Sequence, residues 1–314
     1  MKTLFKFLLN TQFKLNQAKS AQAISGFTMI ELLIGTIIAF LIIGPLLGFV
    51  VSILNDDVRE QSKSAGEFEL QAAIDYMSED VSQAYYIYTP DQLEDVGPLP
   101  NPDRGEPLLV FWKLKRLRDA VPPASEIDNT DPINCNPDIC DDASVRALVA
   151  YYLVEDNSPI WCQPEGDNCP KRIVRYEFND GLKKPGGIYY SEGEAKKSQV
   201  KDDGYNEGFD QQLLFEDSEE SRREATNNVT TGTFDSNGDV LINYVDIDPD
   251  EFRIPLADPD DPDDLEPLQR VKFQIRLNSL RRTDANAKSC TDDNPPIGSC
   301  PRASIEVEGL KIKN

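Results

Sequence analysis

Histidine is absent from this chain of 314 residues, and its absence excludes several kinds of catalytic and metal chemistry. Ser-His-Asp and Cys-His nucleophile systems and HExxH zinc sites all need an imidazole. The sequence also contains no Walker A phosphate loop and no GxGxxG motif after a strand. Two carboxylates can hydrolyse a glycoside, but no pair stands out among 55 Asp and Glu residues. We therefore expect a protein that is not an enzyme.

Positive charge is scarce as well. The chain has 32 Lys and Arg residues against 55 Asp and Glu, which gives a formal net charge of -23. Such a surface repels phosphate, so we expect no nucleic-acid partner. The exception is the segment 1–26, which carries four lysines and no acid.

One apolar run dominates the chain. Residues 32–54 include no charged side chain and, as a helix, are long enough to cross a bilayer core of roughly 30 Å. Glu31 stands directly before this run. A carboxylate at the hydrocarbon edge costs a few kcal/mol unless it is paired, so Glu31 is predicted to have a functional partner.

The order of the N-terminal segments differs from that of a secretory signal, in which the apolar part precedes the cleavage site and is discarded. Here the basic segment comes first, Gly26 second and the apolar run last. The stretch GFTMIE at residues 26–31 resembles the class III leader of type IV pilins and pseudopilins. The resemblance implies that prepilin peptidase cuts after Gly26 and methylates the new N-terminus at Phe27. It also implies that Glu31 pairs with the N-terminal amine of a neighbouring subunit, since both charges are costly to bury alone.

The alternative to this leader is a plain signal anchor in which Glu31 occurs by chance. In either case the positive-inside bias predicts a single-pass protein of the inner (plasma) membrane, with a cytoplasmic N-terminus and a periplasmic head. We divide the chain into the leader 1–26, a transmembrane half-helix 27–54, an amphipathic half-helix 55–88 and a β-rich head 89–314.

The amphipathic half-helix is predicted from apolar residues three and four positions apart, which form one stripe on a helix. The stripe consists of Leu70, Ile74, Met77, Val81, Ala84 or Tyr85, and Tyr88. Asp80 is predicted to lie on the opposite, solvated face. Thr89 precedes a proline, which disfavours the helical conformation, so we expect the helix to end at residue 88.

Beyond residue 90 the apolar period becomes two, which is typical of strands. Strands are predicted at residues 108–113, 145–154, 173–178, 240–247, 271–277 and 305–312, the last with a bulge at Gly309. Long helices do not separate them. The expected fold class is therefore α+β and pilin-like, with an antiparallel sheet packed on the amphipathic half of the N-terminal helix and long loops between strands.

The six cysteines form three couples that are close in sequence. Six cysteines allow fifteen pairings, and we predict the three local ones because each couple lies in one loop-like stretch. An oxidising periplasm fits such bridges. A zinc site is the alternative, although the chain has no CxxC spacing. The predicted disulfides are Cys135–Cys140, Cys162–Cys169 and Cys290–Cys300.

One acidic cluster has the spacing of an EF-hand-like calcium loop. Its candidate ligands are Asp235, Asn237, Asp239 and Asp246, but Val240 stands where such loops have glycine. Asn237-Gly238 between two strand-like runs is also a strong signal for a plain hairpin. Some pseudopilins bind calcium in the head, so both interpretations stay open, and no other cofactor is expected.

A narrower resemblance concerns about the first 115 residues. The runs PLLGFVV (45–51), NDDVREQ (55–61), QAAIDY (71–76), YYIY (85–88) and LVFWK (109–113) are similar to the cyanobacterial pseudopilins of hormogonium polysaccharide secretion, of the C type. The run VAYYL (149–153) is similar to the larger minor pseudopilins of type II secretion. The family implies a minor subunit of a short pseudopilus that supports polysaccharide export and gliding motility.

The resemblance implies as partners prepilin peptidase, other pseudopilins, the inner-membrane assembly platform, membrane lipid and an exported polysaccharide. Two other classes of protein remain as alternatives. The first is an adhesin or sugar-binding pilin with an aromatic platform made of Trp161, Tyr189 or Tyr190. The second is a membrane-anchored carbohydrate-active enzyme with two facing carboxylates.

Overall fold

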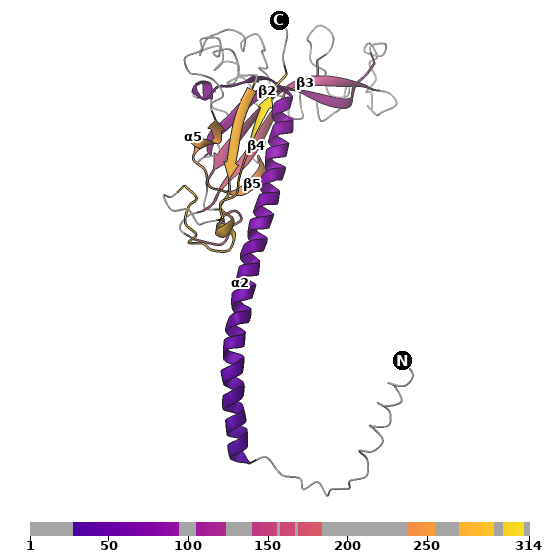
Figure 1. The fold of residues 1–314 in the computed structure, drawn as a ribbon. Coiled ribbons are helices and arrows are strands. Elements are labelled where there is room, and N and C mark those ends of the chain that lie inside the picture. The colour runs from indigo at the N-terminus through magenta and orange to yellow at the C-terminus, as the bar shows by residue number, and fades with distance from the viewer. Residues whose placement is uncertain are drawn as a thin grey trace, which may run out of the picture. The chain divides into compact units, whose positions relative to one another are not determined.

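The computed structural model describes residues 28–93, 105–123, 140–155, 158–166, 169–183, 238–254, 270–291 and 298–310. The chain divides into two compact units, Met1–Asp56 and Asp57–Asn314. The first unit contains the N-terminal part of helix α2. The second contains the rest of α2 and all the described strands (Figure 1).

Helix α2 runs without interruption over Met29–Ser82 and passes through Pro45. It begins at Thr28, whose Oγ1 accepts a hydrogen bond from the N–H of Glu31 at 3.3 Å and so caps the first turn. Within the second unit one face of the helix is buried, and this face contains the predicted apolar stripe as far as Val81. The buried residues are Gly66, Leu70, Ala73, Ile74, Met77, Asp80 and Val81.

Two details of the predicted helix are wrong. It ends at Ser82 rather than at residue 88, because Ala84–Ile87 forms strand β1. Aromatic and β-branched residues favour strands, and residues 84–87 gain ladder partners in the neighbouring strand that a helix would not offer. Asp80 is buried, not solvated, with 5% of its surface exposed.

The strands form two antiparallel sheets. The five-stranded sheet has the order β1-β2-β3-β4-β5 and the three-stranded sheet the order β6-β7-β8. Their bounds are β2 Gly105–Val121, β3 Asp141–Val154, β4 Lys171–Asn179, β5 Asp239–Val245, β6 Arg253–Ile254, β7 Arg270–Arg276 and β8 Arg302–Glu308. Short helices are η1 Asp91–Leu93, α5 Pro249–Phe252 and η5 Ser279–Arg282. An isolated bridge between Val245 and Leu277 connects the two sheets.

All six predicted strands are present, and a long apolar N-terminal helix packs on antiparallel strands, which is consistent with the expected α+β class. The predicted bulge at Gly309 is wrong, because β8 already ends at Glu308 and Gly309 follows it.

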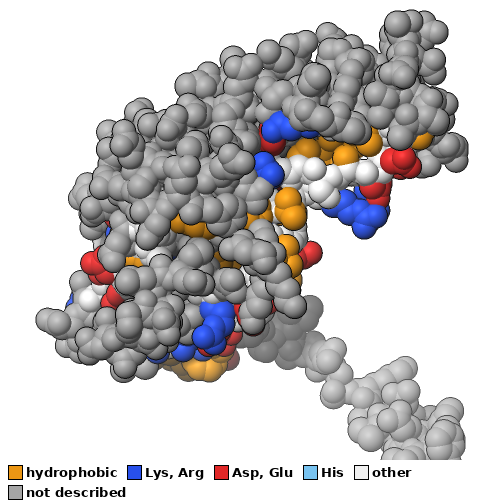
Figure 2. Space-filling model, turned by 90° about the horizontal axis from the view of Figure 1, so that it is seen from above, with side chains coloured by type: hydrophobic (Ala, Val, Ile, Leu, Met, Phe, Trp, Pro, Cys, Tyr) orange, Lys and Arg blue, Asp and Glu red, His pale blue; other side chains and the backbone are white. Residues whose placement is uncertain are grey.

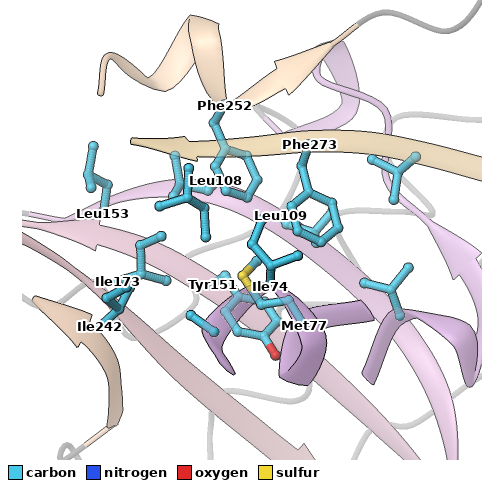
Figure 3. Packing of buried hydrophobic residues seen from close by; sticks show 14 of the residues in the cluster. Ile74, Met77, Leu108, Leu109, Tyr151, Leu153, Ile173, Ile242, Phe252 and Phe273 are labelled. Carbon is cyan, nitrogen blue, oxygen red and sulfur yellow. The ribbon is translucent and has the colours of Figure 1, made fainter. Parts of the chain in front are cut away.

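Two large hydrophobic clusters and a smaller one around Leu117 and Leu182 build the described core of the second unit. In the first, the buried face of α2 packs against β2, β3 and β7, and Figure 3 shows Ile74 and Met77 beside Leu109 and Tyr151. The rings of Phe252 and Phe273 stack in the same cluster, with centroids 5.6 Å apart. The second cluster lies on the other face of the five-stranded sheet and is rich in aromatic rings. Its aromatic members are Tyr85, Tyr86, Tyr88, Trp112, Tyr152, Tyr176 and Phe178.

Candidate functional site

The start of α2 brings together the described part of the predicted processing and assembly motif. Gly26 and Phe27 lie outside the described residues. Thr28 is the N-cap, and Glu31 stands in the first turn with an exposed side chain. The partial positive charge of a helix N-terminus stabilises an acid there. Thr28 and Glu31 also have the spacing of a capping box, a helix-start role for this pair that the sequence interpretation missed.

The helix that follows exposes its apolar side chains along the first unit. Phe40 and Leu41 are 79% and 67% exposed. Among the described helices, α2 is the one long and apolar enough to cross a membrane. A continuous apolar surface of this length is unfavourable in water, so it is compatible with a single-pass anchor.

A buried ionic cluster joins α2 to the five-stranded sheet in the second unit. Asp80 accepts hydrogen bonds from Lys113 Nζ at 2.5 Å, from Tyr151 OH at 2.8 Å and from Arg175 Nε at 2.8 Å. Glu177 pairs with Lys113 at 3.2 Å and also with Lys115 and Arg175. One helix and three strands therefore meet at two carboxylates.

The protonation states of this cluster follow from its contacts. Burial alone would raise the pKa of Asp80, but hydrogen bonds and charge from Arg175 and Lys113 outweigh it and lower the pKa. The pKa of Glu177 falls to about 2, because Lys115, Arg175 and Lys113 together outweigh its burial. Burial and the charge of Asp80 raise the pKa of Tyr151, so its hydroxyl keeps its proton and donates it.

Such a cluster fixes how the helix sits on the sheet. Rotating α2 by one residue, or sliding it by one turn, would separate Asp80 from Lys113, Tyr151 and Arg175, and a buried carboxylate without partners is strongly unfavourable. The apolar stripe alone tolerates small shifts, since its contacts have no direction. We infer that Asp80 sets the register of α2 within the second unit.

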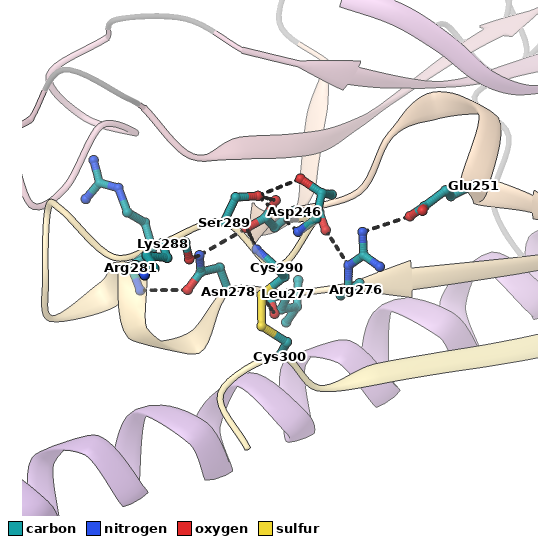
Figure 4. Close-up of a disulfide and its surroundings, with 11 residues drawn as sticks. Asp246, Glu251, Arg276, Leu277, Asn278, Arg281, Lys288, Ser289, Cys290 and Cys300 are labelled. Atoms are coloured by element: carbon teal, nitrogen blue, oxygen red, sulfur yellow. Dashed lines mark hydrogen bonds and ion pairs between the residues drawn. A yellow bond between two sulfur atoms is a disulfide. The ribbon is translucent and has the colours of Figure 1, made fainter. Parts of the chain in front are cut away.

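A second polar network surrounds the disulfide Cys290–Cys300 (Figure 4). Asp246 accepts hydrogen bonds from Ser289 Oγ at 2.6 Å, from the Cys290 N–H at 2.7 Å and from Asn278 Nδ2 at 3.0 Å. Asn278 also donates to the carbonyl of Lys288 at 2.8 Å. Asp246 thus holds the loop before the disulfide against the end of β5.

The structure describes two of the four candidate calcium ligands. Asp235 and Asn237 lie outside the described residues, and Asp239 stands exposed at the start of β5. The carboxylate of Asp246 is engaged in the disulfide network. Within the described part of the chain, no three His, Cys, Asp or Glu side chains are grouped to hold a metal ion.

Close packing explains why residue 238 is a glycine, independently of any turn. A Cβ at this position would lie 2.5 Å from Val174 Cγ1 and 2.6 Å from Tyr176 Cε1, so β5 begins in close contact with β4. The first strand of the predicted hairpin, at 230–234, lies outside the described residues.

Two of the three predicted disulfides, Cys162–Cys169 and Cys290–Cys300, are confirmed. A zinc site at these four cysteines is therefore wrong. Cys135 of the third couple lies outside the described residues. Of the aromatic residues named for a sugar platform, Trp161 stacks with the Arg172 guanidinium, 5.4 Å from its ring centroid, while Tyr189 and Tyr190 lie outside the described residues.

Comparison of the chain with protein-family models, curated proteins and solved structures found no match. The fold and the two units define a class all the same: an α+β protein with one long apolar N-terminal helix whose C-terminal part packs on antiparallel strands.

Proposed function

We propose that this protein is a minor pseudopilin, a membrane-anchored assembly subunit of a type IV pilus-like pseudopilus. One observation carries the proposal: α2 starts two residues after the predicted new N-terminus, with Thr28 as its cap and Glu31 in its first turn, and continues into an exposed apolar helix. A cut after Gly26 would leave the Phe27 amine directly beside that helix start.

In this function Phe27 and Glu31 have complementary roles. The amine of an incoming subunit pairs with Glu31 of its neighbour, which removes the cost of placing each charge in an apolar environment. The apolar part of α2 anchors the subunit in the inner membrane and then packs among other helices. The β-rich head faces the periplasm, where oxidising conditions suit the two disulfides.

The narrower assignment, a subunit that serves polysaccharide secretion and gliding motility, is proposed on the sequence resemblance of the first 115 residues alone. Its partners would be prepilin peptidase, other pseudopilins and the inner-membrane assembly platform. No catalytic role is proposed.

The test is mass analysis of the N-terminal peptide from membrane-extracted protein. We expect a peptide that begins with N-methylated Phe27. An intact Met1, or a cut after the apolar run, would overturn the proposal.

A paired variant tests the role of Glu31. Glu31→Gln should still be processed after Gly26 but should lose co-purification with the other pseudopilins from crosslinked membranes. Glu60→Gln, which removes an exposed acid farther along the same helix, is the matched control and should behave like the unaltered protein. Equal co-purification of both variants would contradict the pairing.

A further inference from the structure

An exposed apolar stripe runs along α2 within the second unit, outside the buried face of the helix. This α2 stripe consists of Ala65, Phe68, Ala72 and Tyr76, which follow one another at intervals of three and four residues and so lie on one side of the helix. Phe68 is 77% exposed and Tyr76 is 46% exposed. Exposed aromatic side chains of this kind are enriched where proteins bind one another.

The α2 stripe has the shape of a seat for a second helix. Ala65 and Ala72 are seven residues apart, and both are exposed. Their small side chains let the backbone of a partner helix come close, while the ring of Phe68 between them can insert among the partner's side chains. The buried face and Asp80 hold α2 on the sheet, so the stripe is presented on a fixed support.

The border of the α2 stripe is acidic. Among the described residues no cation pairs with Glu60, Glu67 or Glu79, whereas Glu69 is held by Arg282. Asp75 accepts one hydrogen bond, from the neutral side chain of Gln71. The exposed acids that border the stripe and lack a cation are therefore Glu60, Glu67, Asp75 and Glu79.

The two basic residues of α2 between Asp57 and Ser82 lie on another side of the helix. Arg59 and Lys63 precede the buried Gly66 at intervals of four and three residues, so they continue the line of the buried face. Basic side chains do reach the surface elsewhere, as the blue groups in Figure 2 show, and the Arg116 side chain is 74% exposed. The acidic border is thus a property of this side of α2 and not of the whole unit.

We propose that the α2 stripe binds a basic amphipathic helix of another protein. Apolar side chains of that helix would surround Phe68 and lie over the two alanines, as in other complexes in which one helix packs along another surface through residues three and four apart. Its Lys or Arg side chains would lie beside Glu67 and Asp75. These carboxylates then gain the cations that their own chain does not supply.

The charges disfavour a second copy of this chain as the occupant. Two α2 stripes packed face to face would bring acidic borders together in either helix direction, and like charges at an interface oppose association. All residues of the stripe belong to the second unit. Binding is therefore measurable whether or not the chain is cut after Gly26, and a negative result leaves the proposed pseudopilin function standing.

The experiment is fluorescence anisotropy with the full chain in nanodiscs of phosphatidylcholine, a lipid without net charge. The probe is a labelled peptide of three Leu-Ala-Lys-Leu-Lys-Ala-Lys repeats, and the control probe has Glu in place of every Lys. We expect the Glu probe to bind roughly tenfold more weakly than the Lys probe, and Phe68→Ser to weaken binding of the Lys probe by a similar factor. Ile160→Ser, which removes a side chain that is 74% exposed outside the stripe, is the matched control and should leave binding unchanged.

A second variant tests the charges without altering the ring. Glu67→Gln/Asp75→Asn should bind the Lys probe several-fold more weakly, and its binding should depend less on salt than that of the unaltered protein. The melting temperatures of both variants should stay close to that of the unaltered protein, because the changed side chains are exposed.

Four results would overturn the proposal. The first is an absence of binding of the Lys probe. The second is equal binding of the Lys probe to empty nanodiscs, which would assign it to lipid. The third is equal binding by Phe68→Ser and the unaltered protein, which would mean general attraction to an acidic surface. The fourth is dimerisation of the chain in sedimentation that Phe68→Ser removes, which would assign the stripe to a second copy.

Discussion

Replacing Asp80 by alanine tests whether the buried ionic cluster holds α2 on the sheet. The substitution removes the acceptor of hydrogen bonds from Lys113, Tyr151 and Arg175. Both cations stay buried, since Lys113 is 6% and Arg175 is 7% exposed. Glu177 still contacts both, so they do not lose every carboxylate.

Breaking a buried ion pair by removing one partner destabilises a protein by about 3 to 5 kcal/mol. Asp80 serves two cations and a hydroxyl, whereas the remaining contacts to Glu177 offset part of the loss. We therefore expect the free energy of unfolding to fall by about 3 kcal/mol, which lowers the melting temperature by about 6 °C or more in a domain of this size.

The control is Asp75→Ala on the exposed face of the same helix. Asp75 accepts one hydrogen bond, from Gln71 Nε2 at 2.8 Å, and such an i,i+4 contact contributes about 0.2 to 0.5 kcal/mol. Urea unfolding of the full chain in detergent, followed by the fluorescence of buried Trp112, measures both variants. If Asp80→Ala and Asp75→Ala differ by less than 1 kcal/mol, the cluster does not hold the helix.

Three further substitutions give direct tests. The pKa of Glu177 is lowered to about 2 from its unfolded value of 4.5, so its contribution to stability, about 3 kcal/mol, is complete above pH 4.5 and is lost as the pH falls toward 2. In thermal melts between pH 5 and 2.5, Glu177→Gln should therefore lose less stability than the unaltered protein. Parallel curves of melting temperature against pH would contradict this. Gly238→Ala places a Cβ against Val174 and Tyr176 and should cost about 1 to 3 kcal/mol in urea unfolding, while an unchanged midpoint would show that β5 can move away. Asp246→Ala leaves the donors of its loop without an acceptor and should raise amide exchange at Cys290, the residue whose N–H it binds; unchanged exchange would mean that the disulfide alone orders the loop.

The sequence predicted the features of this fold that depend on neighbouring residues. The apolar stripe of α2, the six strands and the two described disulfides follow from spacing along the chain, and each is present in the structure. Strand β1 was missed because it depends on residues that are distant in the sequence. Its residues continue the helical spacing of the stripe, and only pairing with β2, about 25 residues away, decides for a strand.

Asp246 shows why the candidate metal site could not be settled from spacing. The pattern that begins at Asp235 places Asp246 at the last position of a calcium loop. Its hydrogen-bond partners Asn278, Ser289 and Cys290, however, are all more than thirty residues farther along the chain. Sequence spacing describes the loop that precedes Asp246. The fold decides which donors reach its carboxylate.

Two acids of α2 illustrate the same limit at the level of function. Glu31 was singled out because it is an acid at the start of a long apolar run, whereas Asp80 was assigned to a polar face that already holds other acids. The structure places the cations for Asp80 on β2 and β4, at sequence separations of 33 and 95 residues. A desolvated carboxylate is unfavourable both in a protein interior and at a bilayer edge, so each acid needs a partner there. For Asp80 the sheet of its own chain supplies it. For Glu31, in the first unit, the proposed assembly would supply it as the Phe27 amine of a neighbouring subunit, and this difference would separate an acid that holds the fold together from one that is proposed to join subunits.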